Sequence, residues 1–165
     1  MIRHLVVMGP SGNGKSALGA ALADRLSLPF IEGDACHPPA NVAKMARGEP
    51  LDDADRAPFL DAVAAALAAH PGGAVAACSA LKRTYRERLR TAVPGLLFVL
   101  PQVGRATLHR RMADRPGHFM PPALLDSQLA TLELPQPGEA ALLLDGEQPL
   151  ATLVQQIADH LSHAG

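Results

Sequence analysis

The sequence predicts an α/β fold in which five parallel strands form one sheet and helices cover both of its faces. Three observations support this prediction: strand-like and helix-like segments alternate, a glycine-rich turn joins the first pair, and no linker or internal repeat divides the chain. Strands that alternate with helices form parallel sheets, because each helix carries the chain back across one face. A length of 165 residues is typical of one domain, which we expect to span residues 1–165.

The individual elements are predicted from short apolar runs and from the stretches between them. Runs bounded by Gly, Pro or Asp are typical of buried strands, and they occur at Leu5–Met8, Phe30–Gly33, Ala74–Cys78, Leu96–Leu100 and Ala141–Leu144. Helical stretches lie at Lys15–Leu26, Asn41–Arg47, Ala57–His70, Thr84–Ala92, Arg105–Asp114 and Leu150–Ser162. Ligands of parallel sheets bind at the carboxyl ends of the strands, so functional residues are expected directly after each strand.

One segment, from Arg115 to Gly138, interrupts the alternation. It contains five prolines and several bulky apolar residues. Long excursions of this kind often fold over an active site. We therefore expect residues 115–138 to form a lid.

The composition excludes several classes of protein. The formal net charge is −1, so we expect neither nucleic acid nor a membrane surface as a partner. No apolar run approaches the ~20 residues of a membrane span, and the first strand begins too early to leave room for a signal peptide. Two cysteines, Cys36 and Cys78, are too few for a disulfide framework or a zinc cluster. We expect a cytoplasmic setting, with Cys78 buried as a small apolar residue.

The turn after the first predicted strand has the spacing of a phosphate-binding P-loop. The pattern Gly-x-x-x-x-Gly-Lys-Ser covers Gly9, Pro10, Ser11, Gly12, Asn13, Gly14, Lys15 and Ser16. Glycines let successive N–H groups point inward around an anion, and the following helix adds its positive dipole end. Lys15, which we expect to be exposed to solvent, can reach the β- and γ-phosphates, and the Ser16 hydroxyl can ligate Mg²⁺. The alternative is an incidental lysine in a glycine-rich turn, but the flanking strand and helix favour a nucleoside triphosphate site.

Two polar residues follow the second predicted strand, at the sheet edge where the P-loop also lies. Asp34 can orient an attacking hydroxyl and accept its proton, or hold a metal-bound water, which makes it a candidate catalytic and substrate-binding residue. Its alternative role is to cap a turn or a helix. His37 can hydrogen-bond a substrate hydroxyl, although its place before two prolines is equally consistent with a turn contact.

Three cations are candidates for binding an acidic acceptor. Arg56 lies near the start of a predicted helix, where a positive charge needs an anion, either the neighbouring aspartates or an acidic substrate. Lys82 and Arg86 are four residues apart after the third strand and share one helical face. Both can pair with a substrate carboxylate. A solvated basic helix face is the alternative for this pair.

The lid and the helix before it supply three more candidates. Arg111 and Arg115 are four residues apart near a helix C-terminus, where the dipole favours cations for structural reasons alone. Beside a P-loop they can instead reach ATP and the transferring phosphoryl group, with Arg115 as a catalytic residue. His118 can be carried to the acceptor as the lid closes, or make only a local loop contact.

Together these segments resemble the gluconate kinase family, the small thermoresistant-type gluconokinases related to shikimate and adenylate kinases. The similarity covers nearly the whole chain and rests on GPSGNGKS, EGDACHPPANVAKMARGEPLDDADRAPFL, CSALKRTYRERLR, RPGHFM, LLDSQLATLELP and LLLDGEQPL. The second and third segments are much more specific than the P-loop, which many kinases share. One departure is Phe59, where the family often has tryptophan, and we expect it to change packing rather than chemistry.

The resemblance implies a P-loop nucleotide-kinase-like, three-layer fold with a mobile lid, in a homodimer that phosphorylates D-gluconate to 6-phospho-D-gluconate with ATP and Mg²⁺. A shikimate-like kinase or another sugar-acid kinase would share this chemistry. A nucleotide kinase would need a base-stacking pocket, yet the chain has only four Phe, one Tyr and no Trp. A non-catalytic ATP-binding module would be expected to lack Lys15, Ser16 or Asp34, and all three are present.

Overall fold

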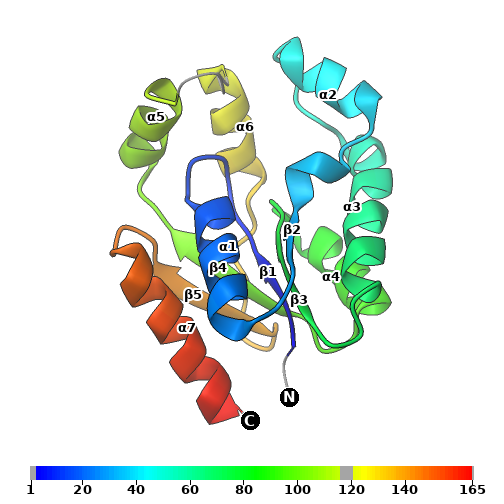
Figure 1. Ribbon diagram of the computed structural model, residues 1–165. Helices are drawn as coiled ribbons and strands as arrows, with labels where there is room; N and C mark the ends of the chain where they lie inside the picture. Colours follow the sequence, from blue (N-terminus) through cyan, green and yellow to red (C-terminus); the bar gives the residue numbers. More distant parts are fainter. Residues whose placement is uncertain (1–2, 116–120, 165) are drawn as a thin grey trace.

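The central sheet has five strands, all parallel, in the order β2-β3-β1-β4-β5. The structure is a computed structural model that describes residues 3–115 and 121–164 (Figure 1). The strands are β1 (His4–Val7), β2 (Phe30–Glu32), β3 (Ala74–Ala77), β4 (Leu97–Gln102) and β5 (Ala141–Asp145). The predicted five-stranded parallel sheet is confirmed.

The strands are connected by helices at both faces. The helices are α1 (Lys15–Leu26), α2 (Pro39–Ala46), α3 (Asp53–Ala68), α4 (Arg83–Ala92), α5 (Arg105–Ala113), α6 (Pro122–Thr131) and α7 (Leu150–Ala164), with a 3₁₀ turn η1 (Gly33–Cys36) after β2. Helix α6 lies within the predicted lid and was not expected as a helix. Its prolines stand at Pro121 and Pro122, the N-cap and first position, where a missing N–H costs nothing and the fixed φ favours a helix start.

Helix α3 begins at Asp53, four residues before its predicted start. Asp52 and Asp55 form a capping box, in which each side chain accepts a hydrogen bond from the backbone N–H of the other residue. The aspartates therefore start the helix and also place Arg56 in its first turn. This position brings Arg56 to the edge of the sheet where the P-loop lies.

The core consists of two apolar layers, one on each face of the sheet. Leu5 and Val7 of β1 pack with α1 and α7, whereas Val6 packs with α3 and α4 on the other face. Successive side chains of a strand point to opposite faces, so a strand covered on both sides is apolar throughout. All three residues are fully buried, and Figure 1 shows the two helix layers on either side of the sheet.

Two further expectations concern Cys78 and membrane segments. Cys78 is buried as predicted, and its burial raises the pKa of the thiol to about 12, so the thiol stays protonated. Within residues 3–115 and 121–164, no helix combines the length and apolar character that crossing a bilayer requires.

Candidate active site

A cavity of about 470 Å³ is lined by residues at the carboxyl ends of the strands and by residues of α2, α5 and α6. Figure 1 shows these three helices at one end of the sheet. The cavity brings together candidates that the sequence places in separate segments: Ser11, Lys15, Ser16, Asp34, His37, Arg56 and Arg115. Its other polar lining residues are Glu32, Glu49, Ser79, Ser127 and Gln128. The remaining wall is mostly aliphatic. One cavity thus joins the P-loop to the acidic and basic candidates.

The P-loop backbone adopts a conformation that requires glycine at three positions. The φ angles of Gly9, Gly12 and Gly14 are 130°, 88° and 85°, in the region that side chains disfavour. At Gly9 there is also no space, because a Cβ there would lie 2.0 Å from Nδ2 of Asn13. Gly14 is the N-cap of α1, so its φ sets the direction in which the helix leaves the loop.

The Asn13 side chain holds the P-loop to the sheet. Asn13 is 2% exposed, and its Nδ2 donates to the carbonyl of Met8 at 2.9 Å and to that of Pro101 at 3.2 Å. Its Oδ1 accepts from the backbone N–H of Lys15 at 3.1 Å. The amide therefore connects the ends of β1 and β4 to the start of α1. The sequence analysis places Asn13 in the loop but does not predict the hydrogen bonds of its side chain.

Lys15 is buried, and the expectation that it is exposed to solvent is wrong. The residue is 8% exposed, and its Nζ lies 3.5 Å from the carbonyl oxygen of Pro10. The loop curls over the side chain, which therefore loses contact with water. Burial lowers the pKa of Lys15, while the nearby carboxylates of Asp34 and Glu32 act in the opposite direction.

Two carboxylates, Asp34 and Glu32, lie near Lys15, and Glu32 is not among the residues predicted from the sequence. Glu32 lines the cavity, and its Oε1 is buried without a hydrogen-bond partner among the described residues. Buried carboxylate oxygens are normally paired, so this atom is available to a ligand. Glu32 is the last residue of β2, so its place at a strand end was a signal that could have identified it, as it did Asp34.

His37 is held in one orientation by two neighbours. Its ring stacks on Phe59, with 3.8 Å between centroids and an interplanar angle of 8°. Asn41 Nδ2 donates to the carbonyl of Asp55 at 2.8 Å and lies 3.3 Å from Nδ1 of His37. Because the Asp55 carbonyl can only accept, the Asn41 group that faces it is the NH₂ group. The same NH₂ group donates to His37 Nδ1, which places the ring proton on Nε2. Burial lowers the pKa of His37, which favours this neutral form.

Arg86 does not face the cavity, and its interpretation as a substrate-binding cation is corrected. The residue is fully buried, and its Nε and Nη2 donate to the two carboxylate oxygens of Glu139 at 2.8 and 3.2 Å. Its Nη1 donates to the carbonyls of Ala80 and Leu81 at 3.0 and 3.2 Å. The guanidinium is therefore occupied by protein groups. Spacing alone did not show which face of α4 points inward.

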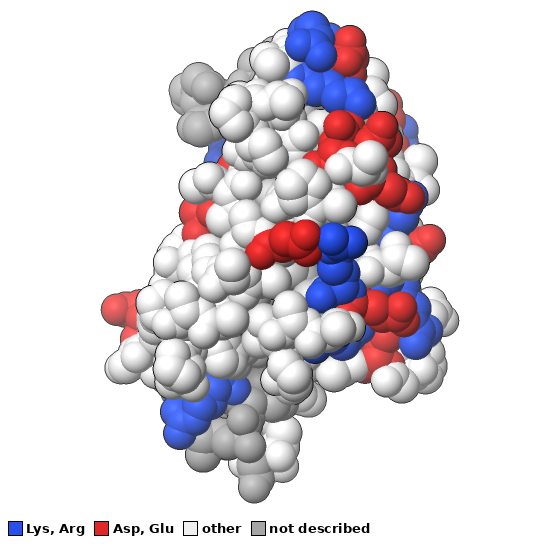
Figure 2. All heavy atoms as spheres, turned by 90° about the vertical axis from the view of Figure 1, so that its right-hand side faces the viewer, with Lys and Arg blue, Asp and Glu red and all other residues white. Residues whose placement is uncertain are grey.

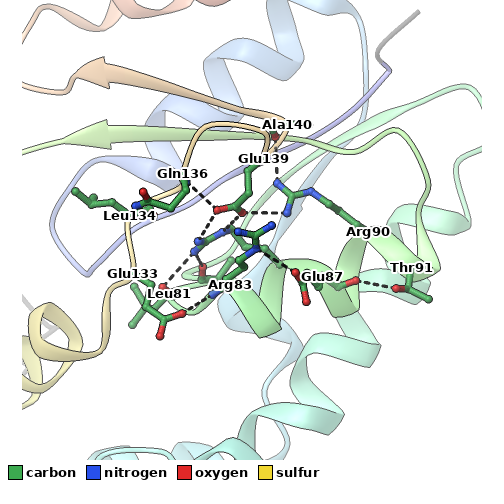
Figure 3. Close-up of polar contacts among 12 residues, drawn as sticks. Leu81, Arg83, Glu87, Arg90, Thr91, Glu133, Leu134, Gln136, Glu139 and Ala140 are labelled. Carbon is green, nitrogen blue, oxygen red and sulfur yellow. Dashed lines mark hydrogen bonds and ion pairs between the residues drawn. The ribbon is translucent and has the colours of Figure 1, made fainter.

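Glu139 belongs to the chain that links α6 to β5, and it joins this chain to α4. Its carboxylate also accepts from Arg90 Nη1 at 3.0 Å and from the backbone N–H of Gln136 at 3.1 Å, as Figure 3 shows. Nearby, Glu133 accepts from the backbone N–H of Arg83 at 2.9 Å. These contacts fasten the end of the predicted lid and the residue after it to α4, from its first residue, Arg83, to Arg90 in its last turn.

Lys82 does not line the cavity either. It is the N-cap residue of α4, and its Nζ donates to Asp53 Oδ1 at 3.0 Å. The hydrogen bond to Asp53 raises the pKa of Lys82. Lys82 and Arg86 therefore do not meet at the cavity, although their spacing places them on one helical face.

Arg111 and Arg115, where the predicted lid begins, both lie close to the P-loop. Arg111 Nη1 donates to the carbonyl of Gly12 at 3.0 Å, and Arg115 lines the cavity. From α6, Gln128 Oε1 accepts from the backbone N–H of Ser11 at 2.8 Å, a contact that the sequence did not predict. His118 lies outside the described residues.

Comparison with known proteins identifies the family. The chain is 48% identical over 163 residues to a gluconokinase of Gluconobacter oxydans, covering 96% of this chain and 90% of the relative. It is 41% identical over 153 residues to the thermoresistant gluconokinase of Escherichia coli, covering 90% and 87%. A solved structure of a gluconokinase from Sinorhizobium meliloti matches with a TM-score of 0.87 at 45% identity, covering 99% and 98% of the two chains. No family model matches the chain. At these identities over nearly the full length, the chain belongs to the gluconokinase family.

Proposed function

We propose that this protein transfers the γ-phosphoryl group of ATP to D-gluconate and forms 6-phospho-D-gluconate. The observation that carries the proposal is a single cavity that contains a P-loop lysine and serine, a carboxylate and two arginines: Lys15, Ser16, Asp34, Arg56 and Arg115. Phosphoryl transfer requires a site for the donor phosphates, a hydroxyl held in line with them, and positive charge around the transferring group. The names of the relatives support the same reaction.

On the donor side, the P-loop from Gly9 to Ser16 binds the phosphates of ATP through its backbone N–H groups. Lys15 stabilises the charge that spreads over the transferring phosphoryl group. Its burial strengthens this effect, because a charge in a water-poor site is screened less. Arg111 binds ATP beside the loop, and Arg115 acts on the transferring group.

On the acceptor side, Asp34 holds the 6-hydroxyl of gluconate in line with the γ-phosphate and accepts its proton late. A loose transition state asks little of a base, so orientation is the larger part of this role. The Nε2–H of His37 donates to a substrate hydroxyl, and Arg56 pairs with the gluconate carboxylate. His118 remains a predicted acceptor contact.

The cofactor in this proposal is Mg²⁺, and the oxygen donors of the cavity fit it. Ser16 and the unpartnered Oε1 of Glu32 are the protein groups that would hold the ion, directly or through water. In the part of the chain that the structure describes, no three His, Cys, Asp or Glu side chains form a metal cluster. A cation held mainly by phosphates and water needs no such cluster. When bound, Mg²⁺ supplies charge neutralisation at the β- and γ-phosphates.

A coupled assay of ADP release tests the proposal against the related activities. The acceptor panel contains gluconate, other aldonates, shikimate and nucleoside monophosphates. We expect gluconate to give the highest kcat/KM. No described residue of the cavity wall is a Phe, Tyr or Trp, the side chains on which an acceptor nucleobase would be expected to stack. Preference for shikimate, another aldonate or a nucleotide would replace gluconate in the proposal, and no ADP release with any acceptor would favour a non-catalytic ATP-binding module.

The remaining parts of the proposal are a cytoplasmic location and a homodimer, which rest on the cysteine content and on the family resemblance. Light scattering of the purified protein tests the oligomeric state. A monomer at assay concentrations would contradict the proposed homodimer and would not affect the proposed location.

A further inference from the structure

Arg56 is held in the cavity wall by a hydroxyl and not by a carboxylate. Its Nη1 donates to the Tyr85 hydroxyl at 3.0 Å. Over the described ranges, no Asp or Glu oxygen lies within ion-pair distance of its guanidinium, whereas all four arginines of α4 have such partners. Arg56 therefore keeps its net positive charge at the cavity while its position is constrained.

The Tyr85 hydroxyl is itself fixed by a carboxylate. It donates to Oδ1 of Asp53, and Lys82 Nζ donates to the same oxygen at 3.0 Å. The Arg56 guanidinium and the Lys82 ammonium also lie over the Tyr85 ring, 5.4 and 5.6 Å from its centroid. These contacts form a continuous series from Lys82 through Asp53 and Tyr85 to Arg56.

The series alternates between two helices, because Asp53 and Arg56 belong to α3, whereas Lys82 is the N-cap of α4 and Tyr85 lies in its first turn. On the side of the molecule where Figure 1 shows α3 and α4, acidic and basic side chains lie next to one another (Figure 2). When two opposite charges on this surface form an ion pair, each neutralises the other. The Tyr85 hydroxyl instead accepts from Arg56 and donates to Asp53, which keeps the two charges apart. Direct pairing of Arg56 with Asp53 would cancel the charge that an anionic acceptor needs. Interposing a hydroxyl orients the guanidinium and preserves its charge.

We propose that Tyr85 and Asp53 are positioning residues that hold the Arg56 guanidinium toward the carboxylate of the acceptor, and that Lys82 acts through Asp53 without touching the substrate. The identity of the acceptor rests on the proposed function. The network itself does not.

The kinetic test compares Tyr85→Phe and Asp53→Asn with the wild-type enzyme. Tyr85→Phe removes the hydroxyl that accepts from Arg56, so we expect KM for gluconate to rise roughly 3- to 10-fold, the factor for one net hydrogen bond. Asp53→Asn keeps an acceptor oxygen but removes the carboxylate charge that holds the Tyr85 hydroxyl, so we expect a rise in the same direction that is no larger. KM for ATP should stay within about twofold, because the P-loop is untouched. The matched control is Asp61→Asn, which breaks an exposed pair with Arg88 across the same two helices and should leave both KM values unchanged.

Lys82→Met distinguishes an indirect effect of Lys82, through Asp53, from direct contact with the substrate. If Lys82 acts through Asp53, Lys82→Met should raise KM for gluconate less than Tyr85→Phe does. A larger effect of Lys82→Met than of Tyr85→Phe would overturn the proposal and indicate that Lys82 binds the substrate. Equal increases of KM for gluconate and ATP in Tyr85→Phe would also overturn it, since they indicate a general structural role.

A spectroscopic test reads the network without catalysis. Tyr85 is the only tyrosine and the chain has no tryptophan, so phenolate absorbance and intrinsic emission report this residue alone. Burial, followed by the hydrogen bond to Asp53, raises the pKa of Tyr85, against the opposing effect of the neighbouring cations Arg56 and Lys82. Asp53→Asn should lower the titration midpoint, and Asp61→Asn should not. An unchanged midpoint in Asp53→Asn would refute the network. If the wild-type protein does not phosphorylate gluconate, the proposed function fails while this titration still tests the contacts.

Discussion

Replacing Arg86 with methionine separates a structural role from a substrate-binding role for this residue. Methionine keeps much of the length and apolar surface of arginine, but it removes the guanidinium. Glu139, whose side chain is 1% exposed, then keeps only Arg90 as a charged partner. The carbonyls of Ala80 and Leu81 also lose their donor.

The size of the effect follows from the burial of the ion pair. Removing one partner of a buried pair costs about 3–5 kcal/mol, because the other charge is left uncompensated in a site without water. Since Arg90 still donates to Glu139, we expect a loss at the lower end, about 3 kcal/mol. For a chain of this length that corresponds to a decrease in Tm of roughly 6–12 °C. Arg88→Met on the same helix removes an exposed pair with Asp61 and should cost about 1 kcal/mol or less.

The assay combines urea and thermal unfolding with steady-state kinetics on the same preparations. Arg86→Met should be much less stable than Arg88→Met, and its folded fraction should keep KM for gluconate within about twofold of the wild-type value. The double variant with Glu139→Gln should lose less than the sum of the single losses, because the two residues form one network. An unchanged Tm together with a tenfold or larger rise in KM for gluconate would refute this reasoning and return Arg86 to the acceptor site.

Three further predictions concern catalysis and pH. Lys15→Ala should lower kcat roughly 10²- to 10³-fold through loss of charge stabilisation, and near-normal turnover of the folded variant would contradict the phosphate site. Asp34→Asn should lower kcat roughly 10²- to 10⁴-fold with little change in KM for ATP, whereas full activity in a destabilised protein would remove Asp34 from the mechanism. Burial opposes ionisation of Glu139, but hydrogen bonds from Arg86, Gln136 and Arg90 outweigh it and lower its pKa to about 2 from the ordinary 4.5. The contribution of Glu139 to stability should therefore be complete above about pH 4.5 and be lost as the pH falls toward 2. The free energy of unfolding in urea, measured across this range, should depend less on pH in Arg86→Met than in the wild-type protein.

Local patterns in the sequence were sufficient to predict the sheet, most of its helices and the phosphate-binding loop. Buried strands between helices are apolar on both faces, so runs such as Leu5–Met8 are visible without knowledge of their neighbours. The P-loop depends on backbone conformation over a few residues, which Gly9, Gly12 and Gly14 encode directly. Asp34 was selected because its strand ends at the same edge as the P-loop, and it lines the same cavity as Lys15.

The tertiary structure decided the partners of the charged and polar side chains, because those partners are distant in sequence. Arg86 has a spacing suited to an acceptor site, but Glu139, 53 residues away, takes its guanidinium. In the sequence nothing distinguishes Asn13 from other loop residues, because its partner Pro101 is 88 residues away. Periodicity predicts which residues are buried and which element they belong to. The group that compensates a buried charge depends instead on how the elements pack. For this protein, the sequence alone determined the fold and the family, and packing determined which of the candidate cations line the cavity.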